Sequence, residues 1–260
     1  MELLLVSKFQ TFLLILARVL GIFVGTPFFS NRNIPSQVKG GLALFISFVL
    51  FPGLADNLGV KIPQEMALYA FLVSQELLIG LVIGFACNIM FTVFLLSGQF
   101  YSLQMGLGII NVMDPLSQLQ LPIIGQLLSL YGLLIFLLVG GHHLVIIALH
   151  RSFEIVPTFG PASFGPLAKG LIDMFARMFA AAFMLGMPII GVLFLCSVAM
   201  GLLSRAAPQM NIMMLGWPVN IFVGLFTLII LVPALFGIGR EIFEELFAGI
   251  DRILYSLTLV

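Results

Sequence analysis

Ionisable side chains are scarce in this sequence, and their positions limit the chemistry that it can do. The 260 residues include 11 Lys and Arg, 11 Asp and Glu and 3 His, while 61% are hydrophobic. Arg18 and Glu76 stand in apolar stretches without an oppositely charged partner on the same predicted helix. A charge in hydrocarbon costs about 2.5–3.5 kcal/mol on insertion scales. We therefore expect Arg18 and Glu76 to pair with other helices or subunits, and we include Arg205 among these assembly charges.

The histidines and cysteines do not predict a metal site. His143 and His150 share one helix face but are separated by ~10 Å along the axis, too far to bind one ion. His142 points elsewhere on the same helix. Cys87 and Cys196 stand in separate apolar stretches and are typical of buried small hydrophobes. We expect no metal and no cofactor.

Enzyme motifs are missing from the sequence. It has no H-E-x-x-H, no Walker A loop and no G-x-G-x-x-G. The run Gly-Pro-Ala-Ser-Phe-Gly at 160–165 has one residue too many before the serine for a nucleophile elbow, and no strand precedes it. We expect a protein that is not an enzyme.

The elements that carry these residues are hydrophobic helices. Only 8% of the residues are charged, against about 25% in globular proteins, which excludes a soluble domain. The balanced charges provide no basic surface for nucleic acid. Several charge-free runs exceed the ~20 residues that cross hydrocarbon, and they lack the alternation of a membrane β-barrel.

We therefore predict an all-α integral membrane protein in which some helices are bent or broken. Six hydrophobic helices are expected, at about 9–29, 38–55, 66–96, 123–150, 167–203 and 217–239. Pro188 inside the fifth predicts a kink. No soluble domain is appended, so residues 1–260 are expected to form a single membrane domain.

The C-terminal residues 239–260 predict an amphipathic helix. Its apolar residues fall on one stripe: Phe243, Leu246, Phe247, Ile250, Ile253, Leu254 and Leu257. Such a helix lies on an apolar surface rather than crossing the membrane. We expect this tail to dock on a neighbouring subunit or on the membrane face.

Two Gly-x-x-x-Gly pairs, Gly21/Gly25 and Gly80/Gly84, allow helix backbones to approach closely. With 26 glycines in the chain, chance can also produce such pairs. Either origin indicates tight helix packing.

Two segments differ from the apolar runs. Residues 99–122 combine amides, glycines and large apolar side chains, so we expect irregular backbone that is buried by protein or lines a cavity. An ordinary interfacial loop is the alternative. Residues 204–218 are the second such segment and contain Met210, Met213 and Met214, which can seal around changing shapes or simply pack in a core.

Several motifs together resemble the FliR family of flagellar biosynthetic proteins, which is related to the SctT proteins of virulence systems. The resemblance covers nearly the whole chain. Its blocks are Leu16 to Leu20, Thr26-Pro27, Asn33 to Pro35 with Val38 to Leu42, Gln75 to Gly80, Gly98 to Leu107 with Asp114-Pro115, Gly141 to His143, and the most specific one, Gly201 to Ile212. Trp217, where Phe is expected, is the one departure.

This resemblance implies a subunit of the flagellar type III secretion export gate in the bacterial inner membrane, at the basal body. FliR proteins assemble with FliP and FliQ, and FlhB joins them. Unfolded flagellar proteins cross this gate, driven by ion-motive force and a cytoplasmic ATPase. The resemblance also implies helices that are bent rather than simple crossings.

A gate for unfolded chains needs a removable seal, and residues 99–122 suit a plug. Gly106 and Gly108 would supply hinges. Asn111 could hydrogen-bond freed backbone, and Asp114 suits a turn before Pro115. Apolar bulk would come from Met105, Ile109, Ile110 and Met113. The family resemblance points the same way.

Two other functions remain open. A secondary transporter or channel for small solutes would place ionisable residues at broken helices, often in two related halves. The irregular segments here carry amides, Met and Gly, with only Asp114 ionised. A membrane scaffold is the third possibility.

Overall fold

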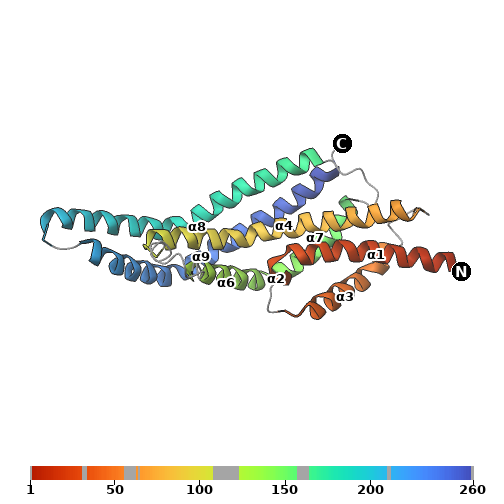
Figure 1. Cartoon of the computed structure of the whole chain (residues 1–260), viewed down its shortest axis with the longest axis horizontal. Coiled ribbons are helices and arrows are strands. Elements are labelled where there is room, and N and C mark those ends of the chain that lie inside the picture. The colour runs from red at the N-terminus through yellow and green to blue at the C-terminus, as the bar shows by residue number, and fades with distance from the viewer. Residues whose placement is uncertain are drawn as a thin grey trace. The chain divides into compact units, whose positions relative to one another are not determined.

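The computed structural model describes residues 2–30, 34–55, 63, 65–107, 123–156, 164–209 and 212–258, and the regular structure in these ranges is helical throughout. The helices are α1 (Glu2–Gly25), α2 (Pro27–Ser30), α3 (Ser36–Ala55), α4 (Met66–Gln104), α6 (Ile123–Leu138), α7 (Gly141–Ile155), α8 (Phe164–Ala206) and α9 (Ile212–Thr258) (Figure 1). The protein is therefore an all-α membrane protein, as predicted.

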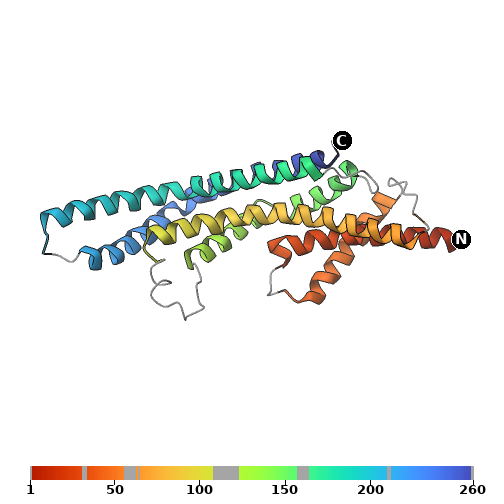
Figure 2. The same cartoon turned by 45° about the horizontal axis from the view of Figure 1, so that its top comes forward.

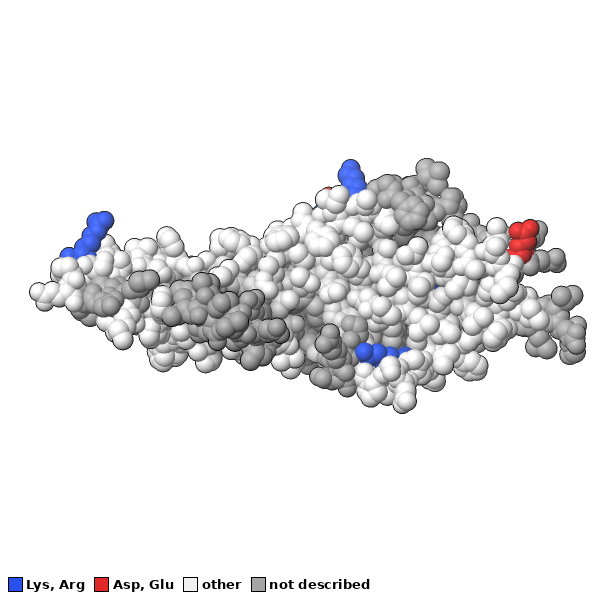
Figure 3. All heavy atoms as spheres, in the orientation of Figure 1, with Lys and Arg blue, Asp and Glu red and all other residues white. Residues whose placement is uncertain are grey.

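Five of the described helices are long and apolar enough to cross a membrane, and the number becomes six if α6 and α7 form one bent span. The six predicted helices correspond to α1, α3, α4, the α6–α7 pair, α8 and α9. The visible surface fits this composition, because charged groups are isolated on a largely uncharged face (Figure 3). In lipid, helices of this kind satisfy their backbone hydrogen bonds internally.

The described residues form two compact units. Unit 1 contains residues 1–89, 140–175 and 245–260, and unit 2 contains residues 90–139 and 176–244. The long helices α4, α8 and α9 each contribute one part to unit 1 and another to unit 2.

In unit 1, helices α1, α3 and the first part of α4 lie side by side (Figures 1 and 2). Phe12 of α1 meets Phe51 of α3 edge to face, with ring centroids 5.9 Å apart. The Tyr69 hydroxyl of α4 donates a hydrogen bond to the Gln10 carbonyl of α1 at 3.0 Å. Apolar burial and a few polar contacts between neighbouring helices thus hold this unit together.

The core of unit 2 is aromatic. The ring of Phe243 on α9 lies against the rings of Phe91, Phe94 and Phe136, with centroids 5.4–5.8 Å apart. Phe243 is fully buried. Aromatic pairs at such separations contribute about 0.5–1.5 kcal/mol beyond their buried area, so this cluster joins α4, α6 and α9.

The cluster corrects the predicted role of the C-terminal tail. Residues 239–260 do not begin a separate helix, because α9 continues to Thr258. Phe243 is buried in unit 2, and Ile250, Ile253 and Leu254 are buried in unit 1. These four residues of the predicted stripe therefore pack within the chain itself rather than on a neighbouring subunit or the membrane face, and the side chains of Leu246 and Leu257 lie outside the described part.

Three predicted boundaries were also wrong. Residues 99–104 are the last turns of α4 rather than irregular backbone, and α9 already includes residues 212–218. The predicted helix at 123–150 is broken between α6 and α7, where Gly140 adopts φ 76°. Glycine adopts this left-handed conformation without the steric cost that other residues meet.

The two Gly-x-x-x-Gly pairs face each other across α1 and α4. A Cβ atom at Gly21 would lie 2.5 Å from the Leu77 carbonyl oxygen, and one at Gly25 would lie 2.7 Å from Gly84 Cα. The successive contacts advance in the same direction along both helices, which therefore run parallel here. Only glycine permits this backbone approach, so the pairs do pack tightly.

We expect Gly84→Leu to separate α1 from α4. A Cβ at Gly84 would lie 2.7 Å from Gly25 Cα and 2.8 Å from the Ile22 carbonyl oxygen. Overpacking of this kind typically costs about 1–3 kcal/mol, and rigid backbone leaves little room to relax. Thermal unfolding of the purified protein in detergent should occur at a clearly lower temperature.

The matched control is Gly41→Leu on α3, where nothing lies within 4 Å of an added Cβ. Its unfolding temperature should stay near that of the parent. Equal unfolding temperatures for Gly84→Leu and the parent would show that the α1–α4 contact is not tight.

Candidate functional site

Arg18 and Glu76 form a buried ion pair in unit 1. Arg18 lies on α1 and Glu76 on α4, each about one turn before the first glycine of the α1–α4 contact. The Arg18 Nε–H donates to Glu76 Oε2 at 2.5 Å, and both side chains are almost completely buried. The two assembly charges therefore meet each other in the same chain.

The remaining donors of Arg18 reach the C-terminal end of α7. Its Nη1 donates to the Ser152 carbonyl at 2.7 Å and to Ser152 Oγ at 3.1 Å, and its Nη2 donates to the Val156 carbonyl at 3.1 Å. The last carbonyls of a helix lack intrahelical donors and carry partial negative charge. The Ser152 carbonyl also accepts the Val156 N–H at 3.0 Å, so Arg18 adds a second donor there and supplies one to the Val156 carbonyl.

An aromatic ring completes the surroundings of Arg18. The guanidinium carbon lies 4.0 Å from the centroid of the Phe153 ring. A cation over an aromatic face is attracted by the ring, and more strongly when both are desolvated. The Ser152 hydroxyl also donates to the Leu149 carbonyl at 2.7 Å, so it is held in place to accept from Arg18.

This arrangement suits a structural joint rather than a reaction centre. Removing one partner of a buried ion pair typically costs about 3–5 kcal/mol, because the other charge stays buried without compensation. Four of the five guanidinium donor positions have a described acceptor. The guanidinium thus connects α1 to α4 and to the end of α7.

The sequence singled out Arg18 and Glu76 because charge is rare, but it did not identify Ser152, Phe153 or Val156. Two of these contacts use backbone carbonyls, and every residue type has one, so the sequence does not single them out. Ser152 is separated from Arg18 by 134 positions. Pro157, just after α7, was the one signal that a helix ends here.

Of the residues assigned to the plug, Met105 and Gly106 are described. Gly106 has φ 81°, and its N–H bonds to the Leu103 carbonyl while the Leu107 N–H bonds to the Ser102 carbonyl. This pattern is a Schellman motif, which ends α4. Gly106 therefore ends α4, and its role as a hinge stays a prediction.

Met105 is fully buried. A Cβ added at Gly224 of α9 would meet the Met105 side chain, so Met105 packs in the core of unit 2. The other plug residues lie outside the described residues: Gly108, Ile109, Ile110, Asn111, Met113 and Asp114.

The methionine group is only partly described. Met210 lies outside the described residues, and of Met213 only the backbone, in the first turn of α9, is described. Met214 is 74% exposed on α9. Arg205 is exposed in the last turn of α8, where a positive charge interacts favourably with the helix dipole. Arg205 belongs to unit 2, whereas Arg18 and Glu76 belong to unit 1.

The histidines and cysteines make none of the described contacts of Arg18 and Glu76. The rings of His142 and His143 lie 4.2 Å apart, and His150 Nδ1 is 3.7 Å from Glu154 Oε1. No group of three His, Cys, Asp or Glu residues in the described ranges could hold a metal ion. Both cysteines are free thiols.

Comparison with known proteins extends over almost the entire chain. Residues 9–246 match the family described as Bacterial export proteins, family 1. The flagellar biosynthetic protein FliR of Bacillus subtilis (strain 168) is 32% identical over 246 residues, which cover 92% of this chain and 93% of that protein. FliR of Escherichia coli (strain K12) is 31% identical over 245 residues, covering 94% and 93%.

A third relative, FliR of Pectobacterium carotovorum subsp. carotovorum, is 30% identical over 245 residues, covering 93% of this chain and 91% of that protein. Each of these three matches covers more than nine-tenths of both chains. The protein described here therefore belongs to the FliR family of bacterial export proteins.

Proposed function

We propose that this protein is a subunit of the flagellar type III protein export gate in the bacterial cytoplasmic membrane. With FliP and FliQ, it would form the conduit through which unfolded flagellar proteins are secreted for flagellum assembly. FlhB would join this complex. The observation that carries this proposal is the match to FliR proteins over more than nine-tenths of the chain. Its role would be conduction and assembly, without catalysis.

Two structural observations support the proposal. The long helices are apolar and leave many large hydrophobic side chains exposed, as in Phe222, Ile229 and Leu195 at 68–73%. In a membrane, such faces contact lipid or other transmembrane helices. The buried ion pair of Arg18 and Glu76 has both partners within the chain. A small-solute transporter, in contrast, needs ionisable groups that its substrate can reach.

Purification of the tagged protein together with FliP and FliQ from its own organism tests this function. We expect a large hetero-oligomer when the complex is weighed by native mass spectrometry in mild detergent. A solitary monomer whose unfolding temperature rises with a small solute would instead identify a transporter. A solitary monomer without such a response would point to a scaffold.

We further propose that Arg18 and Glu76 are required for assembly because they fix the shape of unit 1 that partners would recognise. The pair holds α1 against α4, and Arg18 also fixes the end of α7. Subunits can pack only on a unit whose helices are already in place.

We expect Glu76→Gln to be milder than Glu76→Leu. The amide oxygen of Gln can still accept the Arg18 Nε–H, whereas Leu leaves the guanidinium without its acceptor on α4. The yield of assembled complex and its unfolding temperature should fall in the order parent, Gln, Leu. Full and equal yield from both variants would contradict an assembly role for this charge.

We place the proposed plug in the residues after Leu107. Met105 is buried and Gly106 ends α4, so we propose that the seal of the conduit comes from Gly108, Ile109, Ile110, Asn111, Met113 and Asp114. An open conduit would leak ions, and neutral amides with large apolar side chains can be displaced more easily than a salt-bridged lid. The adaptable methionines Met210, Met213 and Met214 would seal around the same path.

Deletion of residues 108–116 should leave complex assembly largely intact and raise ion leakage through the membrane. This deletion preserves the Schellman motif at the end of α4. Leakage can be measured as collapse of the membrane potential, reported by a potential-sensitive dye.

A second variant replaces residues 108–116 by Gly and Ser at the same length. It keeps the chain connection and removes the apolar bulk, so it should leak as well. A membrane that stays as tight as the parent in both variants would contradict the plug, and so would loss of the complex in both.

A further inference from the structure

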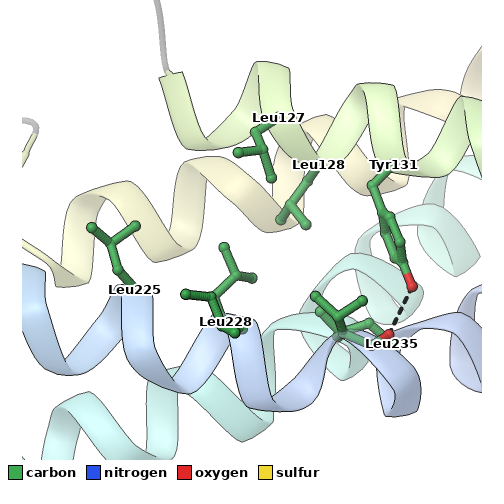
Figure 4. A pocket seen from close by; sticks show the side chains of 8 residues that line it. Leu127, Leu128, Tyr131, Leu225, Leu228 and Leu235 are labelled. Atoms are coloured by element: carbon green, nitrogen blue, oxygen red, sulfur yellow. Dashed lines mark hydrogen bonds between the residues drawn. The ribbon is translucent and has the colours of Figure 1, made fainter.

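Two tyrosine hydroxyls in unit 2 donate hydrogen bonds to the backbone of the α8–α9 hairpin. Tyr101 of α4 donates to the Leu185 carbonyl at 2.6 Å, and Tyr131 of α6 donates to the Val232 carbonyl at 2.7 Å (Figure 4). Helix carbonyls normally accept from an N–H four residues later, so both bonds are additional to the helix pattern.

Both acceptor carbonyls lie within one turn of a proline inside a helix. Leu185 precedes Pro188 by three residues, and Val232 directly precedes Pro233. Proline has no N–H and its ring crowds the carbonyl four residues earlier, so a helix is most easily bent there. The carbonyls that lose a helical donor are those of Met184 and Ile229. The tyrosines therefore contact α8 and α9 within one turn of these interruptions and not at the freed carbonyls themselves.

The two prolines stand at similar distances from the turn of the hairpin. At 1.5 Å per residue, Pro188 lies roughly 27 Å before the end of α8, and Pro233 lies roughly 32 Å after the start of α9. In both views α8 and α9 run side by side over much of their length (Figures 1 and 2). α9 also contains Pro218, nearer to the turn. Pro188 and Pro233 are the two that stand at one level, where both helices can bend together.

Packing beside Tyr131 is loose. A cavity of about 320 Å³ lies between α6 and α9. Leu128 and Tyr131 of α6 face Leu225 and Leu228 of α9 across it (Figure 4). This cavity is partly open to the surface, and α6 and α9 make fewer direct contacts across it. Tyr131 is therefore an important direct tie between α6 and this part of α9.

We propose that the part of α8 after Pro188 and the part of α9 before Pro233 form a hinged arm, and that the hydroxyls of Tyr101 and Tyr131 latch its two pivots. In the structure described here both tyrosine bonds are made, so the arm is latched. Breaking them frees the arm to move away from α4 and α6. This device is independent of the export function proposed above.

Spin labels on the full-length chain in lipid nanodiscs test the latch. In a background with Cys87→Ser and Cys196→Ser, labels at Leu202→Cys on the arm and Leu134→Cys on α6 report their separation by double electron–electron resonance. Both leucines are more than half exposed. Each Tyr→Phe change removes only the hydroxyl and should raise the population of the displaced arm about fivefold, as expected for loss of one hydrogen bond.

Tyr69→Phe is the matched control, because the Tyr69 hydroxyl donates to the Gln10 carbonyl in unit 1. This variant should leave the distance distribution unchanged. The single variant Tyr131→Phe is the mildest test, since its ring is half-buried at the edge of the cavity. An unchanged distribution in a folded Tyr131→Phe protein and in a folded Tyr101→Phe protein would overturn the proposal.

The hinge has its own test. Pro188→Ala with Pro233→Ala restores both helix N–H groups and should narrow the distribution in a Tyr131→Phe background. A distribution that stays broad would place the bending elsewhere and refute the hinge. If the double proline variant does not fold, Pro188→Ala alone decides between these outcomes.

Discussion

A guanidinium that is fully withdrawn from water dictates the arrangement of unit 1. Arg18 has five N–H groups, and hydrocarbon offers none of them an acceptor. The chain provides a carboxylate from α4, a hydroxyl and two carbonyls from the end of α7 and the face of an aromatic ring. The close approach of α1 and α4 at their glycines brings Glu76 within reach, so the small residues and the charge depend on each other. Without this close approach the ion pair could not form, and without Glu76 the buried guanidinium would destabilise the unit.

The need to give every buried polar group a partner also explains which features could be predicted from the sequence and which could not. Charge-free runs located the helices, because the length of an apolar run and the cost of an unpaired backbone group leave few alternatives. The rarity of charge identified Arg18 and Glu76. Their mutual pairing was not predictable, since it depends on which of several helices stand side by side.

The errors at helix ends have a common cause. Polar residues at 99–104 suggested irregular backbone, yet Tyr101 finds an acceptor on α8 and the helix continues past it. Pro218 stood at the start of a predicted helix, yet α9 begins at Ile212 and passes through it. Gly140, in contrast, does break a helix, because it adopts a positive φ. Whether a polar or breaking residue ends a helix depends on tertiary partners that are distant in sequence.

The division of α9 between the two units has a consequence for biosynthesis. Residues 245–258 belong to unit 1, together with residues near the N-terminus. Chains emerge from the ribosome N-terminal end first, and domains often fold in that order. Unit 1 cannot do so, because residues 245–258 are translated after every other segment of this unit. Until residues 245–258 have been synthesised, α1, α3 and the first part of α4 must therefore stay incompletely covered in the membrane. Unit 1 can complete its folding only when this part of α9 is present.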